Sequence, residues 1–294
     1  MLKMTPGALE TLSSEASSLY RIAGKKRKTD GTFRILVDAK YPLKTIHGRI
    51  QCMILRTVTF PKYLQGGISD PVSPRGQVSN AHFHVGSRTL ITEDIEDFFP
   101  KTSASVIFDI WQGFFHFSPE VADCLTKLTT KDGSLPQGAK TSPLLANLVF
   151  WRFERDLAQK FLHKGIVYTR LVDDITCSAK RDLSADKISW VIQNLHSLTY
   201  PLGFTLKRKK ETIAHAGDRM ISTKLVVNKK LSLPAERRSQ IRAAVNSYVG
   251  NPITVSKRDF KRVVGQVAYL TQHHPVQGSA LRNQLRHARL PSGE

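Results

Sequence analysis

A short stretch near the middle of the chain, Ile166 to Ala179, places two adjacent acids, Asp173 and Asp174, between two apolar runs. Valine, isoleucine, tyrosine and threonine are frequent in both runs, which predicts two β-strands. The acids fall where the chain turns between the strands, a position that aspartate tolerates well. A solvated hairpin turn would explain such a pair taken alone. Burying it would be costly without a neutralising cation, and Mg²⁺, which takes oxygen ligands, is the candidate.

A third acid at the end of another apolar run favours the metal interpretation. Asp94 ends the run that begins at Thr89, and Phe98 and Phe99 follow four and five residues later. Three other acids lie close by in the sequence, so the choice of Asp94 depends on its spacing from the two aromatic residues.

The charge of the chain points to a polyanionic partner. Its 294 residues include 44 Lys and Arg against 24 Asp and Glu, which gives a formal net charge of +20. Such an excess suits nucleic acid or an anionic membrane. No apolar run approaches the length of a membrane span and no signal peptide is visible at the start, so nucleic acid is the expected partner. Three isolated cysteines predict reduced core residues of a cytoplasmic protein.

Two further segments have the composition of phosphate-binding elements. Four cations from Lys25 to Lys28 precede an Asp30-Gly31 turn, and Arg34 follows it, which predicts a two-stranded ribbon with cations on both arms. The ribbon is either a solvated basic loop or a cationic cover over a triphosphate. Downstream, the glycine-containing loop Leu135–Gly138 leads to a helix that Thr141 or Ser142 caps and Gly165 ends. Such a helix N-terminus holds an anion or is an ordinary cap.

The segment Asn80–Gly86 contains a His-x-His pair, but no third ligand lies nearby in the sequence. We therefore expect a structural or RNA-contact role rather than a metal site. Two β-prone runs surround Asn228-Lys229, and basic helical patterns follow from Pro234. These helices form either a solvated face or a bundle that grips a nucleic-acid duplex. The cations expected to contact nucleic acid are Arg237, Arg238, Arg242, Arg258, Lys261 and Arg262.

Taken in chain order, these segments resemble a reverse transcriptase, and more narrowly the bacterial retron type related to group II intron enzymes, from about residue 25 to 270. Four motifs carry the resemblance: Asp94-x-x-x-Phe98-Phe99 is similar to the first palm motif, Leu135-Pro136-Gln137-Gly138 with Ser142-Pro143 to the nucleotide-binding motif, Asp173-Asp174 on a hairpin to the third palm motif, and Gly203-Phe204 with Lys209-Lys210 to the later lysine motif.

One signature indicates the retron subfamily, and two other segments differ from the patterns usual in related enzymes. Asn80-Ala81-x-x-His84 resembles the Asn-Ala-x-x-His signature of retron enzymes. Leu171-Val172 stands where related enzymes commonly have an aromatic residue and alanine before the acid pair. Ser222-Thr223-Lys224 stands where retron enzymes have Val-Thr-Gly.

The resemblance implies an α+β right-hand polymerase with fingers, an antiparallel-sheet palm and a helical thumb. We expect an N-terminal segment and fingers in residues 1–88. The palm is expected in residues 89–233, with an interleaved fingers segment at about 103–145, and the thumb in residues 234–294.

The resemblance also implies roles for particular residues. Asp94, Asp173 and Asp174 would hold two Mg²⁺ ions, and Lys210 would protonate the leaving pyrophosphate. Lys28 and Arg34 would hold the triphosphate of the incoming nucleotide, and Gln137 would lie against that nucleotide. The remaining roles are a sugar contact by Phe99 that excludes a ribose hydroxyl, and nucleic-acid contacts by Asn80 and His84.

The function implied is that of an RNA-directed DNA polymerase of a retron. Such an enzyme copies a structured noncoding RNA from dNTPs, starts from a 2′-hydroxyl of that RNA, and makes a branched RNA–DNA molecule called msDNA. Family members act in antiphage defence with a separate effector protein. Two alternatives stay open: a non-retron defence reverse transcriptase, favoured by Ser222-Thr223-Lys224, and an inert RNA-binding subunit, favoured by Leu171-Val172. A metal-dependent nuclease would leave the aromatic pair and the glycine loop unexplained.

Overall fold

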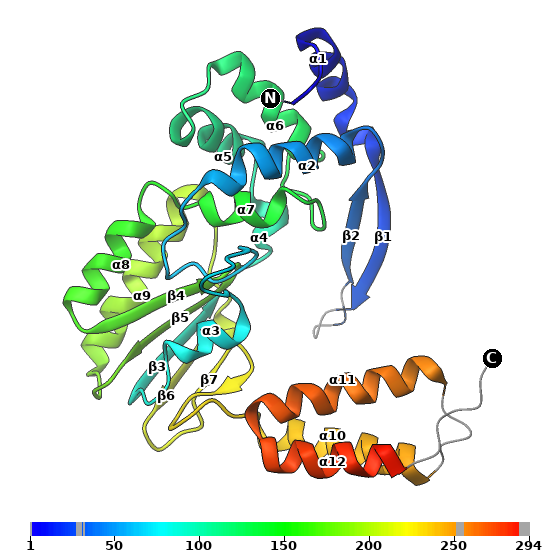
Figure 1. Ribbon diagram of the computed structural model, residues 1–294. Coiled ribbons are helices and arrows are strands. Elements are labelled where there is room, and N and C mark those ends of the chain that lie inside the picture. Colours follow the sequence, from blue (N-terminus) through cyan, green and yellow to red (C-terminus); the bar gives the residue numbers. More distant parts are fainter. Residues whose placement is uncertain (1, 28–30, 32, 251–255, 288–294) are drawn as a thin grey trace.

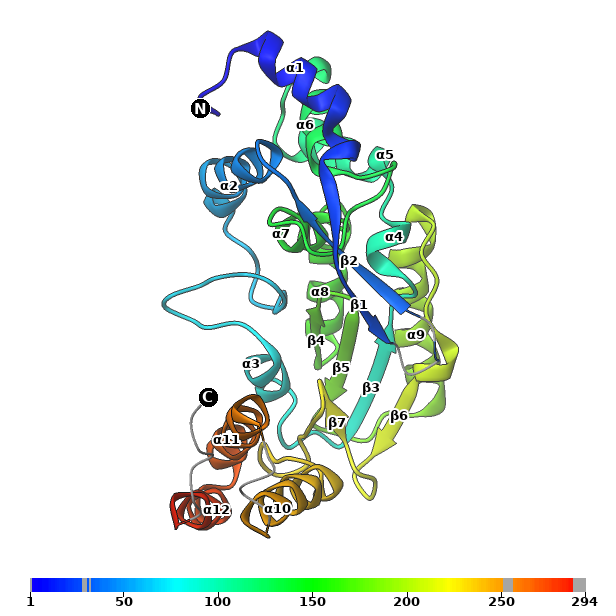
Figure 2. The same ribbon diagram turned by 90° about the vertical axis from the view of Figure 1, so that its right-hand side faces the viewer.

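The computed structural model describes residues 2–27, 31, 33–250 and 256–287, except for the side chain of Lys210. Figures 1 and 2 show three parts in succession: a mainly helical part at the N-terminal end, a central antiparallel sheet flanked by helices, and a helical bundle at the C-terminal end. Lys28, expected to contact the triphosphate, lies outside the described residues.

The first part carries the predicted ribbon. Its elements are α1 (Pro6–Glu15), the 3₁₀ turn η1 (Ala16–Leu19), β1 (Tyr20–Arg27), β2 (Phe33–Ala39), α2 (Leu43–Met53), the 3₁₀ turn η2 (Leu55–Thr57) and α3 (Gln77–His82). Strands β1 and β2 pair antiparallel, with Lys26 opposite Arg34. The ribbon with cations on both arms is therefore confirmed.

The central sheet contains the two predicted acid-bearing elements. Its strands are β3 (Thr89–Asp94), β4 (Ile166–Leu171), β5 (Asp174–Ala179) and β6 (Thr212–His215). They pair antiparallel in the order β4-β5-β3-β6. Because β4 and β5 are joined by a tight turn at Asp173, the predicted acid hairpin is confirmed, and so is the strand that ends in Asp94.

Helices occupy both faces of this sheet. In chain order, the helical elements that lie between β3 and β6 are α4 (Phe98–Lys101), α5 (Ala104–Asp109), the π-helical turn η3 (Ile110–Phe114), α6 (Pro119–Thr129), α7 (Ser142–Leu148), α8 (Glu154–His163), α9 (Ala185–Thr199) and the 3₁₀ turns η4 (Tyr200–Leu202) and η5 (Arg208–Lys210). Side chains alternate between the two faces along a strand. Tyr168 on β4 therefore packs towards α8, where it meets Phe161, whereas the neighbouring Thr169 meets His84, which follows α3. Figure 1 shows α8 and α3 on opposite sides of the sheet.

The single helix predicted from Thr141 to Gly165 is wrong, because two helices, α7 and α8, share that segment. The guanidinium of Arg170 donates hydrogen bonds to the carbonyls of Ala146, at 3.3 Å, and Asn147, at 3.1 Å. Those carbonyls would otherwise accept bonds from the next helical turn. Because a side chain has taken them, α7 ends and the chain restarts as α8. Gly165 ends α8 with a φ of 67°, as predicted.

The C-terminal bundle consists of α10 (Ala235–Gly250), α11 (Lys257–His273) and α12 (Pro275–His287). It is joined to the sheet through a small hairpin of β7 (Ile221–Ser222) and β8 (Leu225–Val226), which turns at Thr223 and Lys224. The sequence predicted two β-prone runs around Asn228-Lys229. The strands of the hairpin lie before that pair, and across Asn228-Lys229 the chain forms an isolated antiparallel bridge between Val226 and Ser232.

Two apolar cores hold these parts together. One joins the N-terminal part to the α8 face of the sheet, and the other joins the bundle to Ala81 of α3 and Leu90 of β3. Both cores cross the expected domain boundaries. The cysteines are free, but only Cys177 is buried, whereas Cys52 is exposed, so the expectation of three core cysteines is wrong.

Candidate active site

Two of the three predicted metal ligands lie opposite each other on neighbouring strands. Asp94 on β3 is the register partner of Asp174 on β5. The backbone amide of Ile95 donates to the carbonyl of Asp173 at 2.9 Å, which fixes the end of the hairpin against β3. Asp94 is 7% exposed, while Asp174 is exposed. Paired antiparallel residues have their side chains on the same face of a sheet, so these two carboxyl groups share one surface.

The turn that carries Asp173 is held by the loop before α3. Val172 has a φ of 63°, an uncommon conformation for a β-branched residue. Gly66 lies directly against it, because a Cβ at residue 66 would come within 2.7 Å of the Val172 amide nitrogen. The Asn147 amide donates to the Gly66 carbonyl at 2.6 Å and so ties this loop to α7. The acid turn and the helix behind the glycine loop therefore share one support.

Arg170 lies directly beneath the acid turn, and the sequence patterns did not single it out. Its side chain is fully buried and donates to both carboxylate oxygens of Glu154, at 2.6 and 2.8 Å. It also donates to the carbonyl of Val172 at 2.9 Å. A charged residue within an apolar strand needs a buried partner, and this was the signal available in the sequence. The geometry makes Arg170 a positioning residue for the turn.

The glycine-containing loop Leu135–Gly138 lies against the ribbon. The Val37 amide on β2 donates to the Gln137 carbonyl at 2.8 Å. Gly138 has a φ of 113°, and a Cβ there would overlap the carbonyl oxygen of Val37. Arg34 lies three residues before Val37 on the same strand. Arg34 and Gln137 thus lie on neighbouring segments. Residue 138 must be glycine because the two backbones approach too closely for a side chain there.

The two adjacent phenylalanines have different environments. Phe98 is 2% exposed and packs between Phe150 and Phe204, with ring centroids 6.0 and 5.3 Å away. Phe99 is only partly buried and meets Phe98 edge to face at 5.9 Å. Phe98 anchors α4 in the core, which leaves Phe99 as the aromatic ring available to a ligand.

The lysine-rich segment runs alongside Asp94. The Lys207 amide donates to the Asp94 carbonyl at 2.8 Å, and Leu206 forms a bridge with Ile95. This pairing places η5, with Lys209 exposed, next to the acid-bearing end of β3. The Lys210 side chain, for which the sequence predicts a catalytic role, lies outside the described residues.

Asn80 and His84 are both fully buried, and their partners belong to the protein. One His84 ring nitrogen lies 2.7 Å from Ser178 Oγ and the other 2.7 Å from Thr169 Oγ1. The Asn80 amide donates to Ser222 Oγ at 3.2 Å. This geometry fits the structural alternative rather than direct contact with nucleic acid. Burial lowers the pKa of His84 to about 3, so the ring is neutral.

The retron-like signature and the segment that departs from it are in contact. Besides the Asn80–Ser222 bond, Thr223 Oγ1 donates to the Gln77 carbonyl at 2.9 Å. The β7–β8 turn is thereby held beside a cavity of about 380 Å³ that also borders Asp94 and Asp174. Arg219 and Lys224 line the same cavity. Two cations therefore stand on the wall that adjoins the acids.

Glu93, next to Asp94, points to the opposite face of β3. Burial, followed by the neighbouring Glu211 carboxyl, raises the pKa of Glu93 to about 8. Neither of its buried carboxylate oxygens accepts a hydrogen bond from a described residue. Glu93 is therefore not a third ligand on the Asp94–Asp174 surface.

The acid pair suits Mg²⁺ as far as the donor chemistry goes. Within the described ranges, no three His, Cys, Asp or Glu side chains converge as a preformed metal site. Mg²⁺ commonly binds one or two protein carboxylates and completes its shell with water and substrate phosphates. Asp94 and Asp174, with Asp173 beside them, supply such a partial set of oxygen ligands.

The predicted nucleic-acid-binding cations lie on α10 and α11. Arg237, Arg242, Arg258, Lys261 and Arg262 are exposed, and Arg238 is half-buried. The apolar residues of these helices, such as Ile241, Val245, Val263 and Val267, are buried between them. The basic residues thus remain on the solvent side of the bundle.

The sequence matches the reverse transcriptase (RNA-dependent DNA polymerase) family over residues 25–267. The chain belongs to this family, and its ribbon, antiparallel sheet and helical bundle form the right-hand polymerase fold that was predicted. We call the central sheet with its helices the palm and α10–α12 the thumb.

Within the family the chain is similar to retron enzymes of bacteria. It is 35% identical over 195 residues to the retron Se72 reverse transcriptase of Salmonella heidelberg (strain 579083-10), covering 66% of this chain and 49% of that protein. It is 28% identical over 256 residues to the retron Ec48 reverse transcriptase of Escherichia coli, covering 82% of this chain and 62% of that protein. The chain therefore matches between about half and three fifths of the length of these curated relatives.

Among solved structures, telomerase from Candida albicans in complex with a fragment of telomeric RNA aligns with 94% of this chain and 61% of its own, with a TM-score of 0.49 and 10% identity. No helix within the described residues is long and apolar enough to cross a membrane.

Proposed function

We propose that this chain is the reverse transcriptase of a retron, an RNA-directed DNA polymerase that uses one structured noncoding RNA as both template and primer. Its substrates would be dNTPs and its product a branched RNA–DNA molecule, msDNA. A separate effector protein would use this product in antiphage defence. Family membership and the similarity to retron enzymes support the proposal.

The observation that carries the polymerase assignment is the pairing of Asp94 with Asp174 on one palm surface, directly beside the turn at Asp173. Nucleotidyl transfer needs in-line positioning and neutralisation of charge rather than covalent chemistry by the protein. Two Mg²⁺ ions, when bound, would activate the primer hydroxyl and neutralise the leaving pyrophosphate. The three aspartates are the residues that would hold them.

The remaining residues would bind and orient the substrates. Arg34 on the ribbon, with Lys28, would hold the triphosphate, and Gln137 would lie against the nucleotide. Phe99 would pack on the sugar, and Lys210 would donate a proton to pyrophosphate. The hydrogen bond between Val37 and Gln137 supports the first two roles, because it joins the ribbon to the glycine loop.

Primer extension on a defined RNA template tests this assignment. Asp173→Asn and Asp174→Asn each remove a carboxylate with little change in shape, so extension should be abolished while RNA binding persists. Asp123→Asn is the matched control, because Asp123 is exposed on α6 and pairs with Lys127 at 2.7 Å. Full extension by the double Asp173→Asn/Asp174→Asn variant would exclude these residues as metal ligands.

The retron assignment needs a separate test, because Ser222-Thr223-Lys224 also favours a non-retron defence enzyme with a different RNA. Nucleic acid that co-purifies with the protein from its native host should be treated with RNase or DNase and sequenced. A discrete DNA joined to a structured RNA supports the retron proposal. DNA of simple repeated sequence would favour the non-retron alternative, and RNA alone would indicate an inactive or unstimulated complex.

A further inference from the structure

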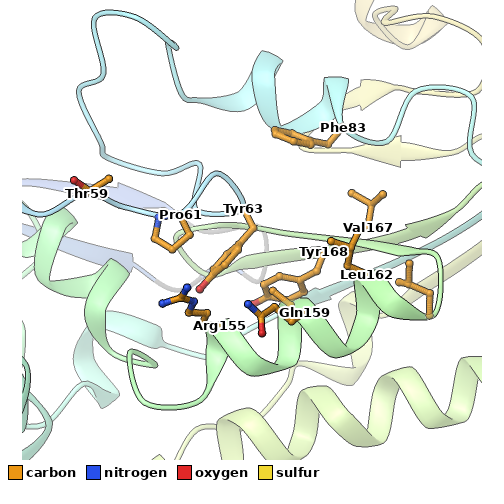
Figure 3. A pocket seen from close by; sticks show the side chains of 11 residues that line it. Thr59, Pro61, Tyr63, Phe83, Arg155, Gln159, Leu162, Val167 and Tyr168 are labelled. Atoms are coloured by element: carbon orange, nitrogen blue, oxygen red, sulfur yellow. The ribbon is translucent and has the colours of Figure 1, made fainter.

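A cavity of about 580 Å³ opens at the outer edge of the palm, away from the acid pair. β4 is an end strand of the sheet and forms its floor. One wall comes from α8, where Arg155, Ala158, Gln159 and Leu162 recur at helical spacing. The loop from Thr59 to Tyr63 forms the other wall, and Phe83, which directly follows α3, lies above (Figure 3). We call this cavity the β4 groove.

The groove exists because a neighbouring segment pairs with β4 for one residue and then turns away. The Arg170 amide donates to the Tyr63 carbonyl at 2.8 Å, and the Gln65 amide donates to the Arg170 carbonyl at 2.9 Å. Arg75 donates to the carbonyls of Phe60, at 2.9 Å, and Pro61, at 2.7 Å, and so holds the preceding chain in a turn. Pairing therefore stops at Arg170, and the space widens towards Ile166.

Unpaired backbone groups of β4 face this space. In an antiparallel pair, successive residues direct their amide and carbonyl groups alternately towards the partner strand and away from it. Arg170 directs its groups away from β5, so Tyr168 and Ile166 do the same. Within the described part of the chain, no backbone hydrogen bond from outside the sheet reaches either residue. The edge thus offers donors and acceptors to another strand.

The side chains around the edge are mainly apolar, and Arg155 is the one charged residue among those that line the cavity. Leu162 is 66% exposed and Phe83 is 39% exposed, although both are large hydrophobic residues. None of the 11 lining residues is acidic, and the exposed Arg155 forms no ion pair with a described residue. RNA would use the aromatic rings, but it would leave the strand edge and the aliphatic wall of α8 unmatched. A polypeptide with apolar side chains and an acidic group matches all of these features.

We propose that the β4 groove binds an extended segment of a partner protein, which adds a short strand to the edge of β4. Successive side chains of that strand would point to opposite faces of the sheet, so that apolar ones pack on Leu162 at the α8 face and on Val167 and Phe83 at the other face. At least one Asp or Glu would pair with Arg155. Addition of a strand to an exposed sheet edge is an established mode of peptide recognition, in which the backbone supplies affinity and the side chains supply specificity.

Selection from a phage-displayed library of random peptides, with the full chain as target, tests this proposal. Clones that also bind the Leu162→Glu variant are removed, because that change places an acid in the apolar wall. Enriched peptides should carry apolar residues at both odd and even positions, because the two phases meet the two walls, and an acidic residue. Measured by fluorescence anisotropy, a synthetic copy should bind Leu162→Glu and Arg155→Glu about tenfold or more weakly than the unchanged chain, which corresponds to the removal of one good interaction.

Backbone methylation of the same peptide distinguishes strand addition from other modes of binding. N-methylation at alternate residues should abolish binding in one phase and spare it in the other, because only every second amide faces β4. Val121→Glu is the matched control protein, since Val121 is 45% exposed on α6 and does not line the groove. All three protein variants should retain primer extension.

Three outcomes would overturn the proposal. The first is a library that yields no peptide dependent on Leu162, and the second is binding that is indifferent to the phase of N-methylation. The third is displacement of the selected peptide by a single-stranded RNA oligonucleotide whose own binding disappears in Phe83→Ala, which would assign the groove to RNA.

Discussion

At the scale of single residues, Arg170 is the clearest positioning residue, because it neutralises Glu154 and also donates to the Val172 carbonyl beside Asp173. Arg170→Met leaves Glu154 buried without its partner, which should cost about 3–5 kcal/mol of unfolding free energy. Arg170→Met/Glu154→Met should recover part of that stability in urea unfolding. It should not recover primer extension, because the turn still lacks its donor. Normal extension by the double variant would show that Arg170 is structural only.

Phe99 gives a second prediction at this scale. Its neighbour Phe98 is fixed in the core, so of these two residues Phe99 is the one that keeps exposed surface. If this ring excludes a ribose hydroxyl, Phe99→Ala should admit ribonucleotides. Single-nucleotide extension with dNTP and NTP measures the ratio of the two. An unchanged ratio would remove Phe99 from the set of residues that bind the sugar.

At the scale of elements, the ribbon depends on its contact with the glycine loop. Gly138→Ala would push a Cβ into the Val37 carbonyl and separate β2 from Gln137. We expect the KM for dNTP to rise more than kcat falls, because the ribbon binds the triphosphate. Gly133→Ala is the matched control: Gly133 also has a positive φ, 75°, but open space around its Cβ position. Equal kinetic effects of the two variants would indicate backbone strain alone.

The packing of α3 on the palm predicts a pH dependence of stability. The pKa of His84 falls from 6.5 to about 3 on burial, so between these values the unfolded chain binds more protons. Neutral, buried His84 therefore makes its full contribution to the free energy of unfolding above about pH 7, and this contribution decreases as the pH falls below 6.5. Unfolding free energy should drop by about 2 kcal/mol from this group between pH 7 and pH 5.

Urea unfolding at several pH values measures this effect against His84→Gln. The variant should be less stable at neutral pH, because glutamine does not reproduce both ring hydrogen bonds, to Ser178 and Thr169. It should also show a shallower fall in stability on acidification. Parallel pH profiles for the two proteins would mean that His84 does not titrate on unfolding in this range.

The same elements show what a sequence pattern does and does not contain. Helix caps are local: the side chains of Ser118 and Ser184 accept hydrogen bonds from backbone amides in the first turns of α6 and α9, and such caps can be recognised in a sequence. The break between α7 and α8 depends on Arg170, which lies well downstream of it in the sequence, and no local pattern shows this. Of the candidate site, the strand-end positions of Asp94 and Asp174 and the turn at Asp173 followed from the predicted strands, and the structure pairs Asp94 with Asp174. The buried roles of Asn80 and His84 did not follow from the sequence, since they arise only when α3 packs on the palm.

At the scale of the whole molecule, the positive charge is segregated from the apolar cores. The formal charge is +20, and the thumb presents exposed cations on both α10 and α11. Among the described residues of this surface, Asp259 lies 3.2 Å from Arg262 and neutralises part of the charge on α11. The other exposed cations of α10 and α11 keep this face of the thumb positive. It is therefore available to the phosphates of a nucleic acid.

This distribution predicts how RNA binding responds to salt. Each phosphate neutralised by Lys or Arg releases condensed counterions, so the logarithm of the affinity should fall linearly with the logarithm of salt concentration. If the chain neutralises six to ten phosphates, its affinity for RNA should fall by a factor of about 10³–10⁵ when the salt concentration rises from 50 to 200 mM. Replacing Arg242, Arg258 and Lys261 together by alanine should reduce the slope by about one unit for each phosphate that is no longer neutralised. Filter binding of a structured RNA measures both slopes, with Lys127→Ala on α6 as the control. Equal slopes for the thumb variant and the unchanged chain would show that the main RNA-binding surface lies outside the thumb. The basic ribbon around Arg34 would then be the next surface to test.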